Sequence, residues 1–88
     1  MHKRLEDFTT RELIERRAIQ ELLHAVLKEL KVALDKQRYN DAIFYNINGT
    51  RLLNLMIERS LALEDEGDML LTLRMNVNNI LRLQHRLQ

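Results

Sequence analysis

The chain has 88 residues, of which 45% are hydrophobic and 31% charged, and its formal net charge is +1. This length fits one small domain, and the apolar fraction excludes an intrinsically disordered chain. The absence of cysteine excludes disulfides, thiolate metal sites and cysteine nucleophiles. No apolar run reaches the length of a membrane span, and no signal-peptide core follows the basic start, so we expect a cytoplasmic protein without a membrane partner.

Leucine and other strong helix formers dominate the composition, proline is absent, and no alternating strand pattern is present. The sequence therefore predicts an all-α domain over residues 1–88, with residues 1–8 as a partly ordered tail. Thr9 and Glu12 fit a capping box before a first helix over about residues 10–36. Its apolar side chains fall on one face: Ile19, Leu22, Leu23, Val26, Leu27, Leu30 and Leu34.

A second helix is predicted over about residues 41–64, with Asn40 or Asp41 as its cap. It carries two apolar stripes instead of one, which predicts burial on more than one side. The stripes consist of Leu52, Leu55, Met56 and Leu63, and of Ile43, Leu53, Ile57 and Leu61. Gly49 lies between Ile43 and Leu53 of the second stripe, and because this stripe stays in phase across it we favour a continuous helix over a turn at Asn48 and Gly49.

The acidic run Glu64–Asp68 is predicted to end the second helix, with Gly67 at its C′ position. Asp68 then caps a third helix over about residues 69–86. One face of this helix is apolar: Met69, Leu70, Leu73, Val77, Ile80, Leu81, Leu83 and Leu87. Short connections make neighbouring helices antiparallel, so we expect an up-down-up bundle of three helices.

Charge is distributed unevenly along the chain. Residues 39–68 carry six acids and two arginines, whereas residues 69–88 carry three arginines and no acid. The polar face of the third helix is therefore a candidate nucleic-acid surface. This candidate surface consists of Arg74, Asn78, Arg82 and Arg86. The alternative is that these cations complement the helix dipole and face the acidic run Glu64–Asp68.

Several apolar residues fall outside the main helical faces: Leu13, Ile14, Val32, Leu71 and Met75. Together with the second stripe of the central helix, they favour a two-fold homodimer that completes the bundle in the manner of a coiled coil. The candidate interface residues are Ile43, Leu53, Ile57, Leu61, Leu71 and Met75. A surface of leucine and methionine also suits the docking of a helix from another protein.

Residues that carry chemistry are few. The pair Glu21 and His24 supplies one half of the Glu-x-x-His pattern of di-metal bundles, and the second half is missing. Only two glycines are present, so no phosphate-cradling loop is expected. We therefore predict no catalytic, cofactor or metal site. The expected function is that of a non-enzymatic interaction module: a regulator, an adaptor or a chaperone-like accessory protein.

One stretch resembles a known family. Phe44, Tyr45, Arg51, Leu52 and Leu55 have the order and spacing of the central helix of the Hha/YmoA-type helical modulators of bacterial gene expression. The likeness covers residues 44–55, and a glycine stands where that family has an acidic residue before the arginine. The resemblance implies binding to a nucleoid-associated protein, and it supports transcription modulation as the alternative function.

Overall fold

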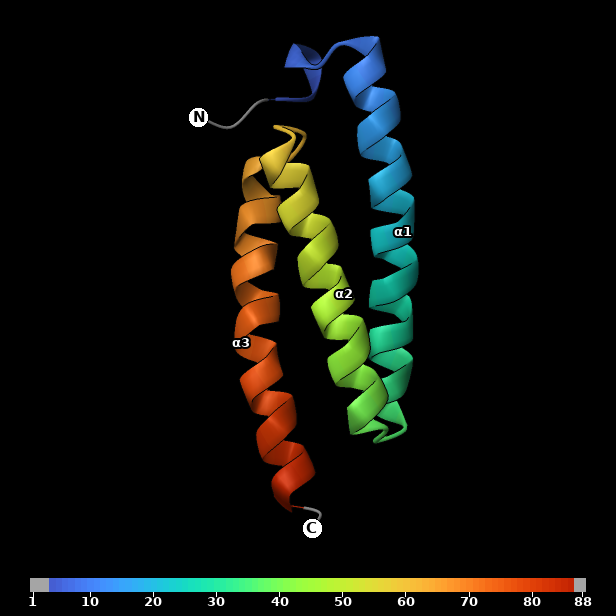
Figure 1. Cartoon of the computed structure of the whole chain (residues 1–88), viewed down its shortest axis with the longest axis vertical. Helices are drawn as coiled ribbons and strands as arrows, with labels where there is room; N and C mark the ends of the chain where they lie inside the picture. The colour runs from blue at the N-terminus through green and yellow to red at the C-terminus, as the bar shows by residue number, and fades with distance from the viewer. Residues whose placement is uncertain (1–3, 87–88) are drawn as a thin grey trace.

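The computed structural model describes residues 4–86. A short 3-10 helix, η1 (Leu5–Asp7), precedes the α-helices α1 (Thr10–Asp35), α2 (Tyr39–Glu58) and α3 (Glu64–Arg86). The three long helices lie side by side with α2 in the middle, and each reverses the direction of the one before (Figure 1). The described residues contain no strand. The predicted all-α, up-down-up arrangement is confirmed.

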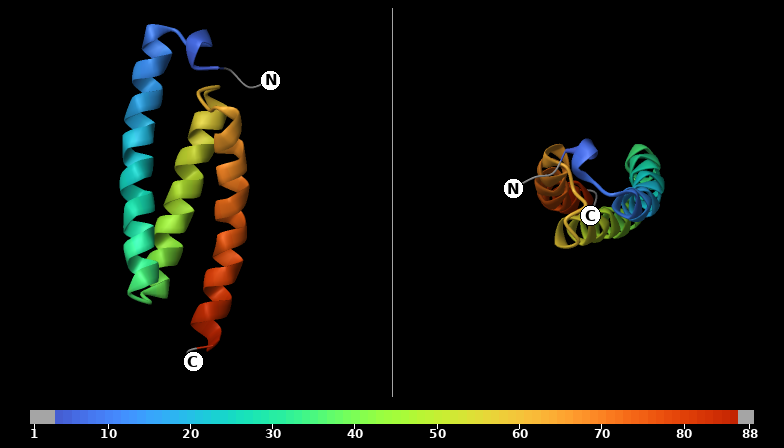
Figure 2. Two further views of the ribbon diagram at one scale, coloured as in Figure 1. Left: turned by 180° about the vertical axis from the view of Figure 1, so that it is seen from behind. Right: turned by 90° about the horizontal axis from the view of Figure 1, so that it is seen from above.

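The start of α1 follows the predicted capping box. The Thr9 side chain accepts a hydrogen bond from the Glu12 amide at 3.1 Å, and the Glu12 carboxylate accepts one from the Thr9 amide at 3.0 Å. Of the predicted tail, Leu5–Asp7 form η1 and Phe8 is buried. The helix η1, which precedes α1, lies over the end of the bundle and extends from α1 towards α3 (Figure 2).

Both turns between helices are closed by a residue other than glycine. Gln37 and Ser60 have φ angles of 58° and 57°, in the left-handed region. In each turn the next amide donates a 2.8 Å hydrogen bond back into the helix, to the carbonyl of Ala33 or Met56, as in a Schellman motif. The helix boundaries shift accordingly: α2 ends at Glu58 instead of residue 64.

The start of α3 also differs from the prediction. It begins at Glu64 instead of residue 69, because the Glu66 carboxylate accepts a 2.6 Å hydrogen bond from the Leu63 amide at the start of the helix. Gly67 and Asp68 therefore lie inside α3, and Gly67 has no positive φ. The prediction that they separate two helices is wrong.

The helix α2 is continuous through Gly49, as expected. Its N-cap is Arg38, so the prediction that Asn40 or Asp41 caps this helix is wrong, and both residues lie in its first turn. Gly49 is buried where side chains of both neighbouring helices meet. A Cβ atom at this position would lie 3.3 Å from Leu73 Cδ1 of α3 and 3.6 Å from Leu27 Cδ2 of α1. The glycine thus allows both outer helices to pack closely on α2.

Both α1 and α3 pack against α2, which explains the two apolar stripes of the central helix (Figure 2). No Cα atom of α1 lies within 8 Å of a Cα atom of α3, so these two helices meet only through side chains. The core is formed by Ile19, Leu23, Leu30, Ala33, Ala42, Leu53, Met56, Leu61, Ala62, Leu70, Leu73 and Ile80.

The buried faces of the outer helices are narrower than predicted, because each of them packs on α2 along one side. Leu22 of α1 is exposed, and so are Met69, Leu81 and Leu83 of α3. The prediction that these four side chains are packed is wrong, and Leu87 lies outside the described residues.

Candidate interaction surface

Two apolar side chains lie one turn apart on the outer face of α3. Leu71 and Met75 are 58% and 69% exposed, whereas Leu70, Leu73 and Ile80 of the same helix are buried in the core. At 100° per residue, the exposed pair lies on the side of α3 opposite to the buried residues. Leu71 and Met75 therefore face away from α2 and from the rest of the chain.

Charged side chains continue this face towards both ends of α3. Glu64 and Asp68 lie in its first turns and Arg82 and Arg86 in its last turns, and all four are exposed. Among residues 4–86, none of the four has an ion-pair partner. We call the whole set the α3 stripe: Glu64, Asp68, Leu71, Met75, Asn78, Arg82 and Arg86. The stripe is acidic at its start, apolar in its middle and basic at its end.

The six residues proposed for a dimer interface do not form one surface. Leu53 and Leu61 are 0% and 1% exposed, so they belong to the core of a single chain. Ile43 is half-buried against that core, and Ile57 is 41% exposed on α2. The remaining two residues are the exposed pair of the α3 stripe, which faces away from α2.

All four residues of the candidate nucleic-acid surface are exposed on α3. Asn78, Arg82 and Arg86 belong to the α3 stripe, and Arg74 lies beside it. The acidic run Glu64–Asp68 occupies the other end of the same helix, so the arginines do not face it within one chain. The dipole alternative agrees with the structure for the last turn, in which Arg86 lies.

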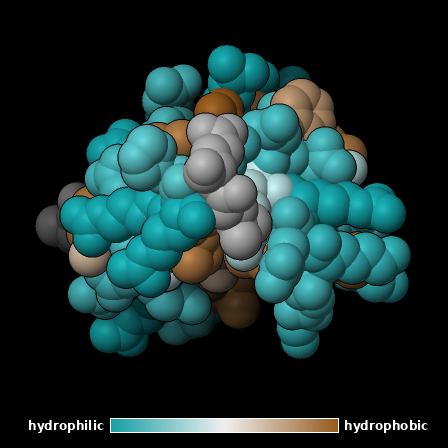
Figure 3. Space-filling model, turned by 90° about the horizontal axis from the view of Figure 1, so that it is seen from below, coloured by the Kyte–Doolittle hydropathy of each residue, from teal (hydrophilic) through white to brown (hydrophobic). Residues whose placement is uncertain are grey.

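The same end of the bundle carries further cations, because α1 runs parallel to α3 and ends there. Lys31 lies in the last turns of α1, and Lys36 and Arg38 lie in the turn between α1 and α2. Viewed from this end, hydrophilic side chains project around the rim, with apolar surface between them (Figure 3). The bundle thus has a basic end and, where α3 begins, an acidic turn.

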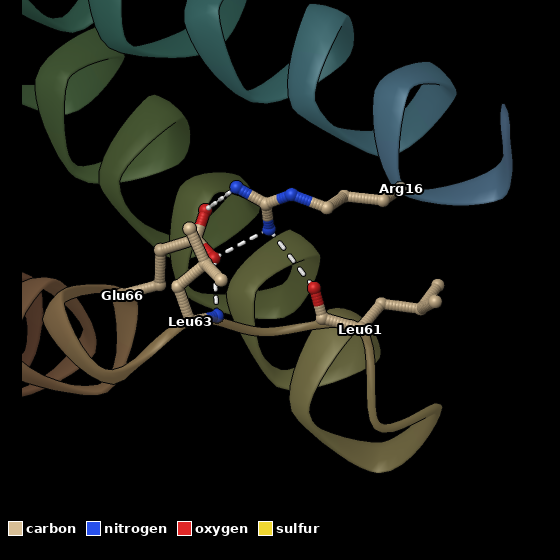
Figure 4. Close-up of polar contacts among 4 residues, drawn as sticks. All are labelled: Arg16, Leu61, Leu63 and Glu66. Carbon is tan, nitrogen blue, oxygen red and sulfur yellow. Dashed lines mark hydrogen bonds and ion pairs between the residues drawn. The ribbon is translucent and has the colours of Figure 1, made fainter. Parts of the chain in front are cut away.

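At the opposite end, a buried ion pair joins α1 to α3. The two guanidinium Nη atoms of Arg16 lie 2.5 and 2.9 Å from the carboxylate oxygens of Glu66, and both side chains are buried (Figure 4). Arg16 also donates a 2.9 Å hydrogen bond to the Leu61 carbonyl. This network, which we call the Arg16 clasp, fixes the α2–α3 turn to α1 and pairs both Nη atoms of Arg16 and both carboxylate oxygens of Glu66 within the fold.

Sequence reasoning missed two buried polar residues. Arg16 lies one turn before Ile19 on the buried face of α1, and a charged residue at that position signals a buried partner. Asn46 is 0% exposed, and its Nδ2 donates a 2.8 Å hydrogen bond to the Leu73 carbonyl across the α2–α3 contact. The signal in that case is the position of Asn46, two turns before Leu53 on the same face.

The residues considered for chemistry lie apart from one another. His24 is exposed on α1, and Glu21 forms an exposed ion pair with Arg17 at 3.4 Å. Within residues 4–86, no group of three or more histidine, cysteine or acidic residues is placed to hold a metal ion. In the same part of the chain, no helix has both the length and the apolar character needed to cross a membrane.

Comparison of the chain with known protein families, with curated proteins and with solved structures gives no significant match. The functional interpretation therefore rests on the fold and on the α3 stripe. Residues 44–55, which carry the resemblance to the Hha/YmoA-type modulators, lie in α2. Within this stretch Phe44 is exposed and its ring packs edge-on against Tyr45.

Proposed function

We propose that this protein is a non-enzymatic helical interaction module that acts as a homodimer through the α3 stripe. The observation that carries the proposal is the exposed pair Leu71 and Met75, at 58% and 69%, on a helix whose other face is fully used by the core. Apolar side chains that gather on one face of a small domain are typical of a contact surface. Their exposure also supports contact over catalysis as the mode of action.

The surface proposed for the dimer is narrower than the sequence suggested. Leu53 and Leu61 of the second stripe are buried within one chain, so they need no second copy to cover them. Of the six candidate interface residues, Leu71 and Met75 on the outward face of α3 are the most exposed, and they form the contact that we propose. Because its apolar part holds only Leu71 and Met75, we expect a smaller contact than the roughly 800 Å² per partner of a standard interface, and dissociation at micromolar concentrations.

The protein acts by direct contact, as a regulator, an adaptor or a chaperone-like accessory protein. Methionine and leucine side chains adapt to differently shaped apolar surfaces. The α3 stripe therefore suits a helix as its partner, either from a second copy or from another protein.

Sedimentation equilibrium of the wild-type protein from about 1 to 500 μM, a range set by the expected affinity, tests the proposal. We expect the mass to rise from 10.5 kDa towards twice that value. The double variant Leu71→Ser/Met75→Ser should stay monomeric with unchanged helix content, because both positions are exposed. Ile14→Ser, at a 66% exposed position of α1, is the matched control and should still dimerise. A wild-type protein that stays monomeric throughout would contradict the proposal.

A second candidate is binding to nucleic acid, alone or with a nucleoid-associated protein. It is favoured by Arg74, Arg82 and Arg86, which are exposed and have no acidic partner among the described residues. Retention of the protein on duplex DNA and on RNA at about 50 mM salt would support it, with loss at higher salt. If the protein is not retained at low salt, this candidate is excluded.

A further inference from the structure

The charged residues of the α3 stripe are placed at equal distances on either side of Met75, acids before it and arginines after it. Asp68 and Arg82 are equally far from Met75 along the helix, in opposite directions, and so are Glu64 and Arg86. All of these residues fall within one narrow sector of the helix at 100° per residue. A half-turn about an axis through Met75, perpendicular to the helix, therefore places each acid at the position of an arginine.

Two copies of such a stripe fit each other in one direction only. In an antiparallel pair, the first turns of one α3 lie beside the last turns of the other, so Asp68 faces Arg82 and Glu64 faces Arg86. In a parallel pair, acids would face acids and arginines would face arginines, which is unfavourable. The charge order therefore selects the antiparallel arrangement and disfavours the parallel one.

The spacing of the stripe is that of a helix–helix seam. From Glu64 to Arg82 the separations alternate between four and three residues, the pattern by which two helices keep one face in contact. The apolar members Leu71 and Met75 occupy the middle of this seam, and the charged members occupy its ends. This order is typical of a contact with a dry centre and a polar rim.

On this basis we propose that two copies of the chain pair through their α3 stripes, antiparallel, with the two-fold axis beside Met75. The proposal rests on the proposed function and names its partner, a second copy of the chain. Met75 of each copy lies against Met75 of the other, and Leu71 lies beside Asn78 and Asn79 of the other copy. The acidic turn of each α3 binds the arginines of the other. The four ionic contacts are exposed to solvent, so the affinity of the dimer falls as salt increases.

A charge-exchange experiment tests this arrangement. In the dimer of the variant Glu64→Arg/Asp68→Arg, all four facing pairs join arginine to arginine, and in the dimer of Arg82→Glu/Arg86→Glu all four join acid to acid. Each variant alone should dimerise at least about tenfold more weakly than the wild-type protein. An equimolar mixture of the two should form a heterodimer with an affinity close to that of the wild-type dimer, because every facing pair is again of opposite sign.

Asp65→Arg is the matched control, because Asp65 lies in the same turn but outside the stripe, and it should leave dimerisation unchanged. Sedimentation equilibrium supplies the affinities, and circular dichroism shows that every variant is helical. Restored binding in the mixture supports the antiparallel pair. If the wild-type protein dimerises and the variants dimerise equally well, the proposal is overturned while the proposed function stands. A monomeric wild-type protein overturns both.

Discussion

Acidic residues in the first turns of α3 lie in two different environments. Glu66 points into the molecule, is buried, and binds Arg16 with both oxygens. Glu64 and Asp68 point outwards and have no partner among residues 4–86. A buried charge must be paired within the fold, whereas an exposed charge contributes little to stability and remains free to bind a partner. The Arg16 clasp therefore belongs to the fold, and the α3 stripe is suited to association.

The largest effect is expected when the Arg16 clasp is broken. Arg16→Met leaves the Glu66 carboxylate buried without a cation, which should lower the free energy of unfolding by about 3–5 kcal/mol. Urea denaturation followed by circular dichroism measures this change. Arg17→Met, at the next position, removes an exposed ion pair with Glu21 and should cost at most about 1 kcal/mol.

The double variant Arg16→Met/Glu66→Gln separates two contributions to the free energy of unfolding: the loss of the ion pair and the cost of burying an unpaired carboxylate. Glutamine keeps an oxygen that can accept the hydrogen bond from the Leu63 amide. Because no buried charge is left, we expect this variant to be more stable than Arg16→Met alone. Equal instability of the two variants would mean that the clasp does not work by pairing charges.

A second, smaller contrast compares neighbouring leucines of α3. Leu73→Ala creates a cavity in the core and should cost about 2–5 kcal/mol, whatever the protein concentration. Leu71→Ala removes an exposed side chain, so it should affect only the stability gained by dimerisation. Thermal unfolding at several protein concentrations tests this, because the difference between Leu71→Ala and the wild-type protein should vanish on dilution. A loss of several kcal/mol for diluted Leu71→Ala would contradict the comparison.

The smallest effect on the free energy of unfolding is expected in the two turns between helices, which take no part in the proposed dimer contact. Gln37 and Ser60 adopt the left-handed conformation, which costs a side chain roughly 1 kcal/mol relative to glycine. Gln37→Gly and Ser60→Gly should each raise the free energy of unfolding by up to about 1 kcal/mol without changing the dimer affinity. Denaturation and sedimentation measure the two quantities separately, and a destabilised glycine variant would argue against this account of the turns.

Much of the fold could be predicted from the sequence, because helix periodicity and capping are local properties. The Thr9 capping box, the continuity of α2 through Gly49 and the three helices are confirmed. The boundary between α2 and α3 could not be predicted, since Ser60 takes the left-handed position that a glycine usually marks. Gly67, which carries that local signal, lies inside a helix whose start is fixed by Glu66.

The exposure of the candidate interface residues could be predicted only in part. Five surplus apolar residues were expected outside the core, and Leu13, Ile14, Val32, Leu71 and Met75 are all exposed. Periodicity identifies which residues share a face but not which neighbour covers it, so Leu53 and Leu61 were assigned to an interface and lie in the core. The sequence did not predict that the acidic run lies within α3, and this placement is what brings Glu64 and Asp68 onto the same helix face as Arg82 and Arg86.

Disulfide trapping tests the proposed α3–α3 contact most directly, because the chain has no cysteine of its own. Met75→Cys places the new thiol beside the proposed two-fold axis, where the equivalent residues of two copies come close enough to bond. Under mild oxidation, we predict that a covalent dimer forms and is seen on a non-reducing gel. Circular dichroism of this dimer in solution should show the helix content of the wild-type protein. Ile14→Cys, which is similarly exposed on α1, should remain monomeric under the same conditions. A monomeric Met75→Cys protein, or equal cross-linking of both variants, would contradict the account.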